Sequence, residues 1–206
     1  TGGEVATTAN ARLIDLDAVA LTTKALDMSG VVADTTVKMG VSDVTITGGS
    51  GKDKIDMVAT WTTKDVIDGG DGTDTLVVRE ADARATAATS TSNIEWLEVS
   101  GTINSAVAIN ADYWGGISNV RFTGTNTAGV VTNLVSGAEI EFDGAAGGTT
   151  LTLKDANGTN DTINLDLDGA GVTYNVTAAN VETINVDANG ATGTSLLALT
   201  AAQLKT

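Results

Sequence analysis

A five-residue pattern of apolar, polar, apolar, polar and glycine residues recurs along the chain and restricts its fold more than any other feature. Complete copies occupy residues 26–30, 44–48, 97–101, 120–124, 140–144, 165–169 and 186–190, and a degenerate copy occupies residues 65–69. Successive copies begin 18, 21, 32, 23, 20, 25 and 21 residues apart. Strict alternation is typical of a strand with one buried face, and the closing glycine allows a sharp turn.

A recurrence near 20 residues is too long for a meander of hairpins. It predicts an all-β, parallel β-solenoid with β-roll or β-helix-like rungs of about 20 residues. The absence of proline agrees, because proline removes a hydrogen-bond donor from stacked strands. A β-sandwich, in which turns follow every 8–12 residues or so, stays the alternative, because residues 150–153 also alternate.

Composition excludes several classes of function. The 206 residues are 42% hydrophobic but only 3% aromatic, and they include no histidine, cysteine or proline. These absences exclude a thiol nucleophile, a Ser-His-Asp relay, an imidazole base, a zinc finger and a disulfide framework. We therefore expect no catalytic residues. Parallel β-helices do host glycosidases that use paired carboxylates, and Glu95, Glu98, Glu139 and Glu141 are available, but no basic or aromatic cluster accompanies them in the sequence.

The chain is strongly acidic, with 11 Lys and Arg against 26 Asp and Glu and a formal charge of −15. Such a surface repels phosphates, so nucleic acid is not an expected partner. It attracts divalent cations, for which short aspartates are good ligands. No apolar run is long enough to span a membrane.

Two segments match the pattern G-G-x-G-x-D-x-apolar, which is the calcium-binding nonapeptide of RTX proteins. Residues 48–55 read GGSGKDKI and residues 69–76 read GGDGTDTL. Calcium takes six to eight oxygen ligands, and glycines let backbone carbonyls turn toward an ion. A purely conformational glycine turn stays the alternative. The predicted metal-site residues here are Gly48, Gly49, Ser50, Gly51 and Asp53 in the first copy, with Asp68, Gly69, Gly70, Asp71, Gly72 and Asp74 in the second.

Other polar and aromatic residues are weaker candidates. Asp155, Asn157 and Asp161 are spaced loosely like a calcium turn, although the sequence equally fits a polar Asn-Gly turn. Asp166, Asp168 and Asp187 alternate with apolar residues, which predicts a solvated strand face. Tyr113 and Trp114 precede two glycines in an expected turn and are candidates for an exposed contact surface, whereas Trp96 lies inside a strand pattern and is expected to pack.

The chain resembles RTX-type bacterial surface-layer (S-layer) proteins and is similar to the S-layer family of Caulobacter and Campylobacter. Beyond the nonapeptides, the resemblance depends on residues 93–99 (NIEWLEV) and their echo at 180–186 (NVETINV). It also depends on residues 153–165 (LKDANGTNDTINL) and 26–30 (LDMSG). Together these segments extend over most of positions 26 to 190.

The resemblance implies a structural, non-enzymatic role. Protomers are exported unfolded by type I secretion, fold on extracellular Ca²⁺ and assemble with copies of themselves into a lattice on the cell surface. The chain is expected to be a fragment of a longer protein, with calcium-binding rungs in residues 1–80, a β-rich repeat region in 93–206 and a seam between. Any cell-surface polysaccharide would be bound by regions outside it. The alternative function is a secreted RTX-type adhesin or a repeat module of a larger exoprotein.

Overall fold

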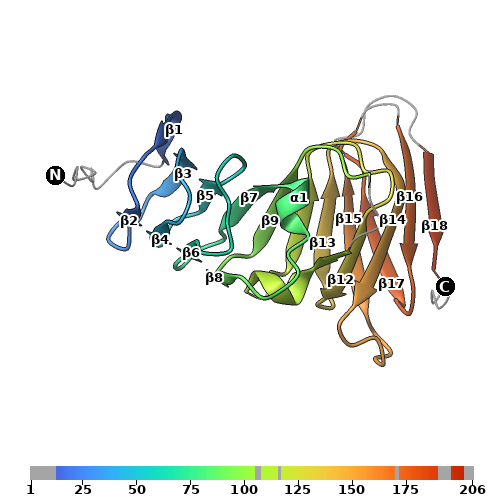
Figure 1. Cartoon of the computed structure of the whole chain (residues 1–206). Helices are drawn as coiled ribbons and strands as arrows, with labels where there is room; N and C mark the ends of the chain where they lie inside the picture. The colour runs from blue at the N-terminus through green and yellow to red at the C-terminus, as the bar shows by residue number, and fades with distance from the viewer. Residues whose placement is uncertain (1–12, 105–107, 116, 170–171, 190–195, 202–206) are drawn as a thin grey trace.

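The chain folds into a parallel β-solenoid of about eight turns, each about 21 residues long. The computed structural model describes residues 13–104, 108–115, 117–169, 172–189 and 196–201. Figure 1 shows the strands stacked in chain order from the N-terminal to the C-terminal end. Every strand pair is parallel, so the sequence-based prediction of a β-solenoid is confirmed and the β-sandwich alternative is wrong.

One face of the solenoid is a continuous sheet, here called sheet A, that runs along its whole described length. In most of its strands alternating residues are buried in the interior, as the sequence pattern requires. The strands of sheet A, in spatial order, are β1 (Leu13–Leu21), β3 (Asp34–Met39), β5 (Asp53–Asp56), β7 (Thr75–Arg79), β9 (Trp96–Ser100), β11 (Asn119–Phe122), β13 (Ala138–Phe142), β15 (Thr162–Leu167) and β17 (Thr183–Asp187).

The opposite face is made of two shorter sheets, called B and C. Sheet B contains β2 (Ala25–Asp27), β4 (Thr45–Thr47), β6 (Val66–Asp68) and β8 (Ser90–Ser92). Sheet C contains β10 (Ala108–Asn110), β12 (Val130–Leu134), β14 (Ala146–Leu153), β16 (Thr173–Ala178) and β18 (Leu196–Thr200). The described helices are the single turn α1 (Glu80–Ala83) and a 3₁₀ helix (Ala111–Trp114), and neither is long enough to cross a membrane.

The sequence pattern moves from the strands of sheet B to those of sheet A, and this move explains its irregular 32-residue step. The copies at 26–30, 44–48 and 65–69 fall on β2, β4 and β6, whereas the copies from residue 97 onward fall on sheet A. Strands β7 and β9 pair across this point, with Thr75 beside Trp96, so sheet A is not interrupted. The glycine at position 190 lies outside the described residues, and the division into two regions stays a prediction.

The core consists of apolar ladders in which one residue from each rung stacks on its counterpart in the next. A ladder through sheet A begins at Val37 and continues through Ile55, Leu76, Leu97, Val120, Ile140 and Leu165, and each of these is at most 1% exposed. Branched aliphatic side chains stack well at the spacing of neighbouring strands, which is why so few aromatics are needed.

Candidate metal site

The two nonapeptide segments form glycine corners that stack directly on each other between sheets B and A. Residues 48–53 join β4 to β5, and residues 69–74 join β6 to β7 one rung later. The amide of Gly48 donates to the carbonyl oxygen of Asp68 at 2.7 Å, and the amide of Asp71 donates to that of Gly49 at 2.9 Å. The corners are therefore held in register by main-chain hydrogen bonds, like the strands on either side of them.

Close stacking requires glycine at these positions. A Cβ on Gly70 would lie 2.2 Å from the carbonyl oxygen of Gly49, and one on Gly72 would lie 2.1 Å from that of Gly51. Gly70 and Gly72 also have φ angles of 92° and 132°, which side chains disfavour. Much of the glycine pattern is thus explained by backbone packing, and participation of glycine carbonyls in metal binding stays a prediction.

The repeated 21-residue spacing of Asp53, Asp74 and Glu95 produces a ladder of carboxylates along the corners. The amide of Gly49 donates to Asp53 Oδ2 at 2.8 Å, and the amide of Asp53 donates to Asp74 Oδ1 at 2.7 Å. The amide of Asp74 in turn donates to Glu95 Oε2 at 2.8 Å. Each acidic side chain therefore binds the backbone of its own corner or of the rung before it.

The second oxygen of each aspartate is what distinguishes this ladder from a purely structural one. Asp53 and Asp74 are 2% and 0% exposed, yet Asp53 Oδ1 and Asp74 Oδ2 have no hydrogen-bond partner among the described residues. Burial, together with the neighbouring carboxylates of Asp53, Glu95 and Asp68, raises the pKa of Asp74 to about 7, although the hydrogen bond from the Asp53 amide acts in the opposite direction. A buried carboxylate oxygen that no protein group binds is stabilised by a proton, a cation or an ordered water.

Asp65 shows what a buried aspartate with a purely structural role looks like in this fold. It is 1% exposed and directly precedes β6. Its Oδ1 accepts from the amide of Val44 at 2.8 Å, and its Oδ2 accepts from the amide of Thr62 at 2.6 Å. Because both oxygens are bound by amides, Asp65 has no free acceptor for an ion and serves as an internal comparison for Asp53 and Asp74.

The remaining predicted residues of the corners lie farther from the buried oxygens. Asp68 is half-buried and accepts from the Gly70 amide at 3.2 Å and from Asn93 Nδ2 at 2.7 Å. Ser50 and Asp71 are exposed at the corner tips. The free acceptor capacity of the site is therefore concentrated on Asp53 and Asp74.

The third predicted group consists of Asp155, Asn157 and Asp161, of which the first two are exposed and the third is buried. Asp155 and Asn157 are exposed, and the Asn157 amide donates to Asp155 Oδ1 at 3.1 Å, as in a polar turn. Asp161 is 8% exposed, and its Oδ2 has no partner among the residues described. The Asp161 amide donates to Glu182 Oε2 at 2.9 Å, which repeats the contact of Asp74 with Glu95.

Sequence reasoning missed Glu95 and Glu182 as members of these sites. Each lies 21 residues after its aspartate, and each receives that aspartate's amide. The signal was present in the echoed segments 93–99 and 180–186, both of which place Asn two residues before the Glu. Asn93 and Asn180 have φ angles of 50° and 57°, so they form the same left-handed corner before the glutamate.

Two expectations about other side chains are wrong. Trp114 is only 1% exposed and packs at a tilt against Trp61, with ring centroids 4.9 Å apart. Its Nε1 donates to the carbonyl oxygen of Ala83 at 3.1 Å, so Trp114 lies in the interior and does not form a contact surface. Basic and aromatic residues do accompany Glu98 and Glu141, since Trp96 and Arg121 line the same surface hollow.

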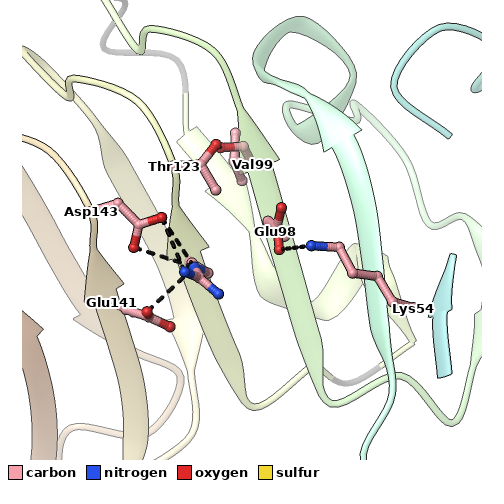
Figure 2. Close-up of polar contacts among 7 residues, drawn as sticks. Lys54, Glu98, Val99, Thr123, Glu141 and Asp143 are labelled. Carbon is pink, nitrogen blue, oxygen red and sulfur yellow. Dashed lines mark hydrogen bonds and ion pairs between the residues drawn. The ribbon is translucent and has the colours of Figure 1, made fainter. Parts of the chain in front are cut away.

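Another acidic group lies on sheet A but is a poor candidate for a cation. Carboxylate oxygens of Glu141, Asp143 and Asp168 lie within 4.8 Å of one another. Arg121 already offsets part of the charge of this group, with Nη2 3.1 Å from Asp143 and Nε 3.3 Å from Glu141. Figure 2 shows Glu141 and Asp143 directed at the same guanidinium group. Asp166 and Asp168 are half-buried and Asp187 is exposed, on outward strand positions as predicted.

Comparisons of the chain with protein-family models, with curated proteins and with solved structures find no match. A function must therefore be inferred from the chain's own residues. The described groups that most need a ligand are the free carboxylate oxygens of Asp53, Asp74 and Asp161.

Proposed function

We propose that this chain is a structural module of a secreted bacterial surface layer, and that calcium ions at its corners fold it for assembly into a two-dimensional lattice. The observation that carries the calcium part is the pair of buried carboxylates, Asp53 and Asp74, each with one oxygen that no described group binds. Asp161 offers a third such oxygen in the C-terminal half.

The donor set favours a hard cation. The chain has no cysteine or histidine, so every side chain that can bind a metal at these corners offers oxygen. Calcium accepts oxygen ligands in flexible geometry, whereas zinc prefers nitrogen and sulfur. Asp53 and Asp74 would hold the ion in the N-terminal half, and Asp161 with Glu182 would hold one in the C-terminal half. When bound, calcium supplies the positive charge that buried carboxylates otherwise lack.

The charge of the whole chain supports a link between calcium and folding. At −15 the chain repels itself, which lowers the stability of its compact state until cations neutralise part of the charge. A protein of this kind is less stable where calcium is scarce, and therefore easier to export unfolded, and it is more stable where calcium is plentiful, outside the cell. Extracellular calcium modules commonly bind with dissociation constants of about 10⁻⁴–10⁻³ M, which suffices for such a switch.

The calcium part is tested by isothermal titration calorimetry on the 206-residue chain and on two variants. The double variant Asp53→Asn with Asp74→Asn keeps both side-chain shapes but removes both charges, and Asp187→Asn removes one exposed charge elsewhere on sheet A. We expect the double variant to lose a calcium site and the Asp187 variant to retain every site. Equal calcium binding by all three proteins would contradict the proposal.

The assembly part is tested separately by light scattering and electron microscopy. Wild-type chain is expected to form ordered sheets in millimolar calcium and to disperse on addition of EGTA. If calcium binds but only single particles form, the lattice is refuted and the alternative of a calcium-dependent adhesin or repeat module of an exoprotein is favoured.

A further inference from the structure

The outward surface of sheet A carries a hollow of about 260 Å³ that the sequence did not predict. It crosses strands β5 to β13, and its lining includes Trp96, Glu98, Arg121, Glu141, Lys52 and Lys54. Trp96 is half-buried and lines this hollow, whereas Trp114 is 1% exposed and Trp61, 7% exposed, lines a different hollow. Asp53 of the first corner also lines the hollow, but its unpartnered Oδ1 is buried.

The polar groups around Trp96 are held in place by ion pairs. Lys54 on β5 reaches over β7 to Glu98 on β9, with Nζ 2.8 Å from Oε2. Arg121 on β11 is held by Glu141 and Asp143 on the other side. Figure 2 shows the Lys54–Glu98 pair and the two acids Glu141 and Asp143 on the same face of sheet A. The hollow therefore offers fixed hydrogen-bond donors and acceptors beside an indole ring.

Among the described residues that line the hollow, Lys52 is the cation that lacks a partner. It is exposed, and its ammonium group forms no ion pair or hydrogen bond with any residue that the structure describes. Lys54 and Arg121, in contrast, are already paired. In a chain with only 11 basic residues and a charge of −15, an unpaired ammonium group beside an accessible indole is a favourable position for an anionic group of a ligand.

We propose that this hollow binds a pyranose ring bearing a carboxylate, such as a uronic acid unit of a glycan. The apolar face of the ring lies on Trp96, because the indole offers an apolar surface and the residues around it offer polar groups. Ring hydroxyls donate to Glu98 and Glu141 and accept from Arg121, and the carboxylate pairs with Lys52. A ring that is apolar on one face and carries both donors and acceptors at its edge fits these groups better than a purely charged or purely apolar ligand.

The proposal is tested by titrating the chain with galacturonic acid trimer and with its neutral counterpart, galactose trimer. Binding is followed by calorimetry and by tryptophan fluorescence, at fixed calcium and with a protein-free blank for calcium bound by the trimer itself. Wild type is expected to bind the acidic trimer at least tenfold more tightly than the neutral one, with a change in fluorescence. Failure of the acidic trimer to bind, or equal affinity for the two trimers, would overturn the proposal.

Three variants locate the site. Lys52→Gln and Trp96→Phe should each weaken binding of the acidic trimer at least tenfold, and Trp96→Phe should also abolish the fluorescence change. Lys64→Gln removes an exposed lysine that pairs with Asp43, away from the hollow, and should bind like wild type. Because Lys52 is exposed, its variant tests the site without a folding defect, which an unchanged melting temperature verifies. Unaltered binding by the Lys52 variant would place any glycan elsewhere.

Discussion

Replacing Asp74 by Asn should stabilise the calcium-free chain and at the same time remove stabilisation by calcium. The asparagine oxygen can still accept from the Asp53 amide, so the corner keeps the 2.7 Å hydrogen bond that Asp74 Oδ1 makes. The negative charge, which is 0% exposed and has one unbound oxygen, is lost. If Asp74 had only a structural role, its replacement would lower the stability of the calcium-free chain.

The magnitude follows from the pKa of Asp74, which burial raises from 3.8 to about 7. Because the pKa is higher in the folded state than in the unfolded state, stability that is present below about pH 4 is lost as the pH rises to 7. A rise of roughly three units corresponds to about 4 kcal/mol at pH 8. The unpaired amide NH₂ of the variant offsets about 2 kcal/mol of this gain, which leaves a net stabilisation of about 2 kcal/mol.

The assay is thermal unfolding by circular dichroism at pH 8, in EGTA and in 10 mM calcium. In EGTA, the Asp74→Asn variant should melt roughly 4–8 °C above wild type. If calcium binds with a dissociation constant of about 10⁻⁴–10⁻³ M, it should stabilise wild type by about 1–3 kcal/mol per site. The variant should lose the stabilisation that comes from the site containing Asp74. At pH 5 in EGTA, where Asp74 is protonated in the folded state, the advantage of the variant should shrink.

Asp65→Asn is the matched control, because both Asp65 oxygens accept from backbone amides. An asparagine NH₂ facing one of those amides should destabilise the chain by about 2–3 kcal/mol, equally in EGTA and in calcium. If Asp74→Asn instead behaves like Asp65→Asn, with lower stability in EGTA and the full calcium increment, then Asp74 is a structural residue and the reasoning about its free oxygen is refuted.

Four further substitutions test the fold and the boundaries of the site. Gly72→Ala should destabilise the chain by about 3 kcal/mol in thermal unfolding, because its Cβ would overlap the stacked backbone, whereas Gly30→Ala, which meets open space, should change stability by about 0.5 kcal/mol or less. Trp114→Ala should lower the free energy of unfolding by about 3–5 kcal/mol in urea titrations, and a folded variant with unchanged stability would contradict its buried position. Asp187→Ala should leave the calcium-dependent rise in melting temperature unaltered, since Asp187 is exposed, and a loss equal to that of Asp74→Asn would mean that ligand and surface acids are wrongly assigned.

The fold was predictable because the repeated pattern indicates both the length of a rung and which residues of each strand face the interior. Alternation placed residues such as Leu97, Ile140 and Leu165 in the interior, and a step near 20 residues required stacked rungs. The sequence did not show that the pattern lies on sheet B before residue 69 and on sheet A after residue 97. The 32-residue step therefore looked like a seam, although sheet A runs through it.

The site was predictable only in part. The spacing of Asp53 and Asp74 with their glycines was visible along the chain, and both residues occupy equivalent corners. The roles of Glu95 and Glu182 depend on contacts between rungs 21 residues apart, which a local motif does not reveal. Trp114 was misassigned because a Trp before glycines suggests an exposed turn, whereas here a 3₁₀ helix carries it into the core.

The most direct measurement is anomalous X-ray diffraction from crystals of the chain grown in millimolar calcium. The bound-cation hypothesis predicts calcium peaks in contact with Asp53 Oδ1 and Asp74 Oδ2, the buried oxygens that lack a partner among the described groups. Ordered corners in which both oxygens contact only water or protein, with no calcium peak beside them, would contradict it.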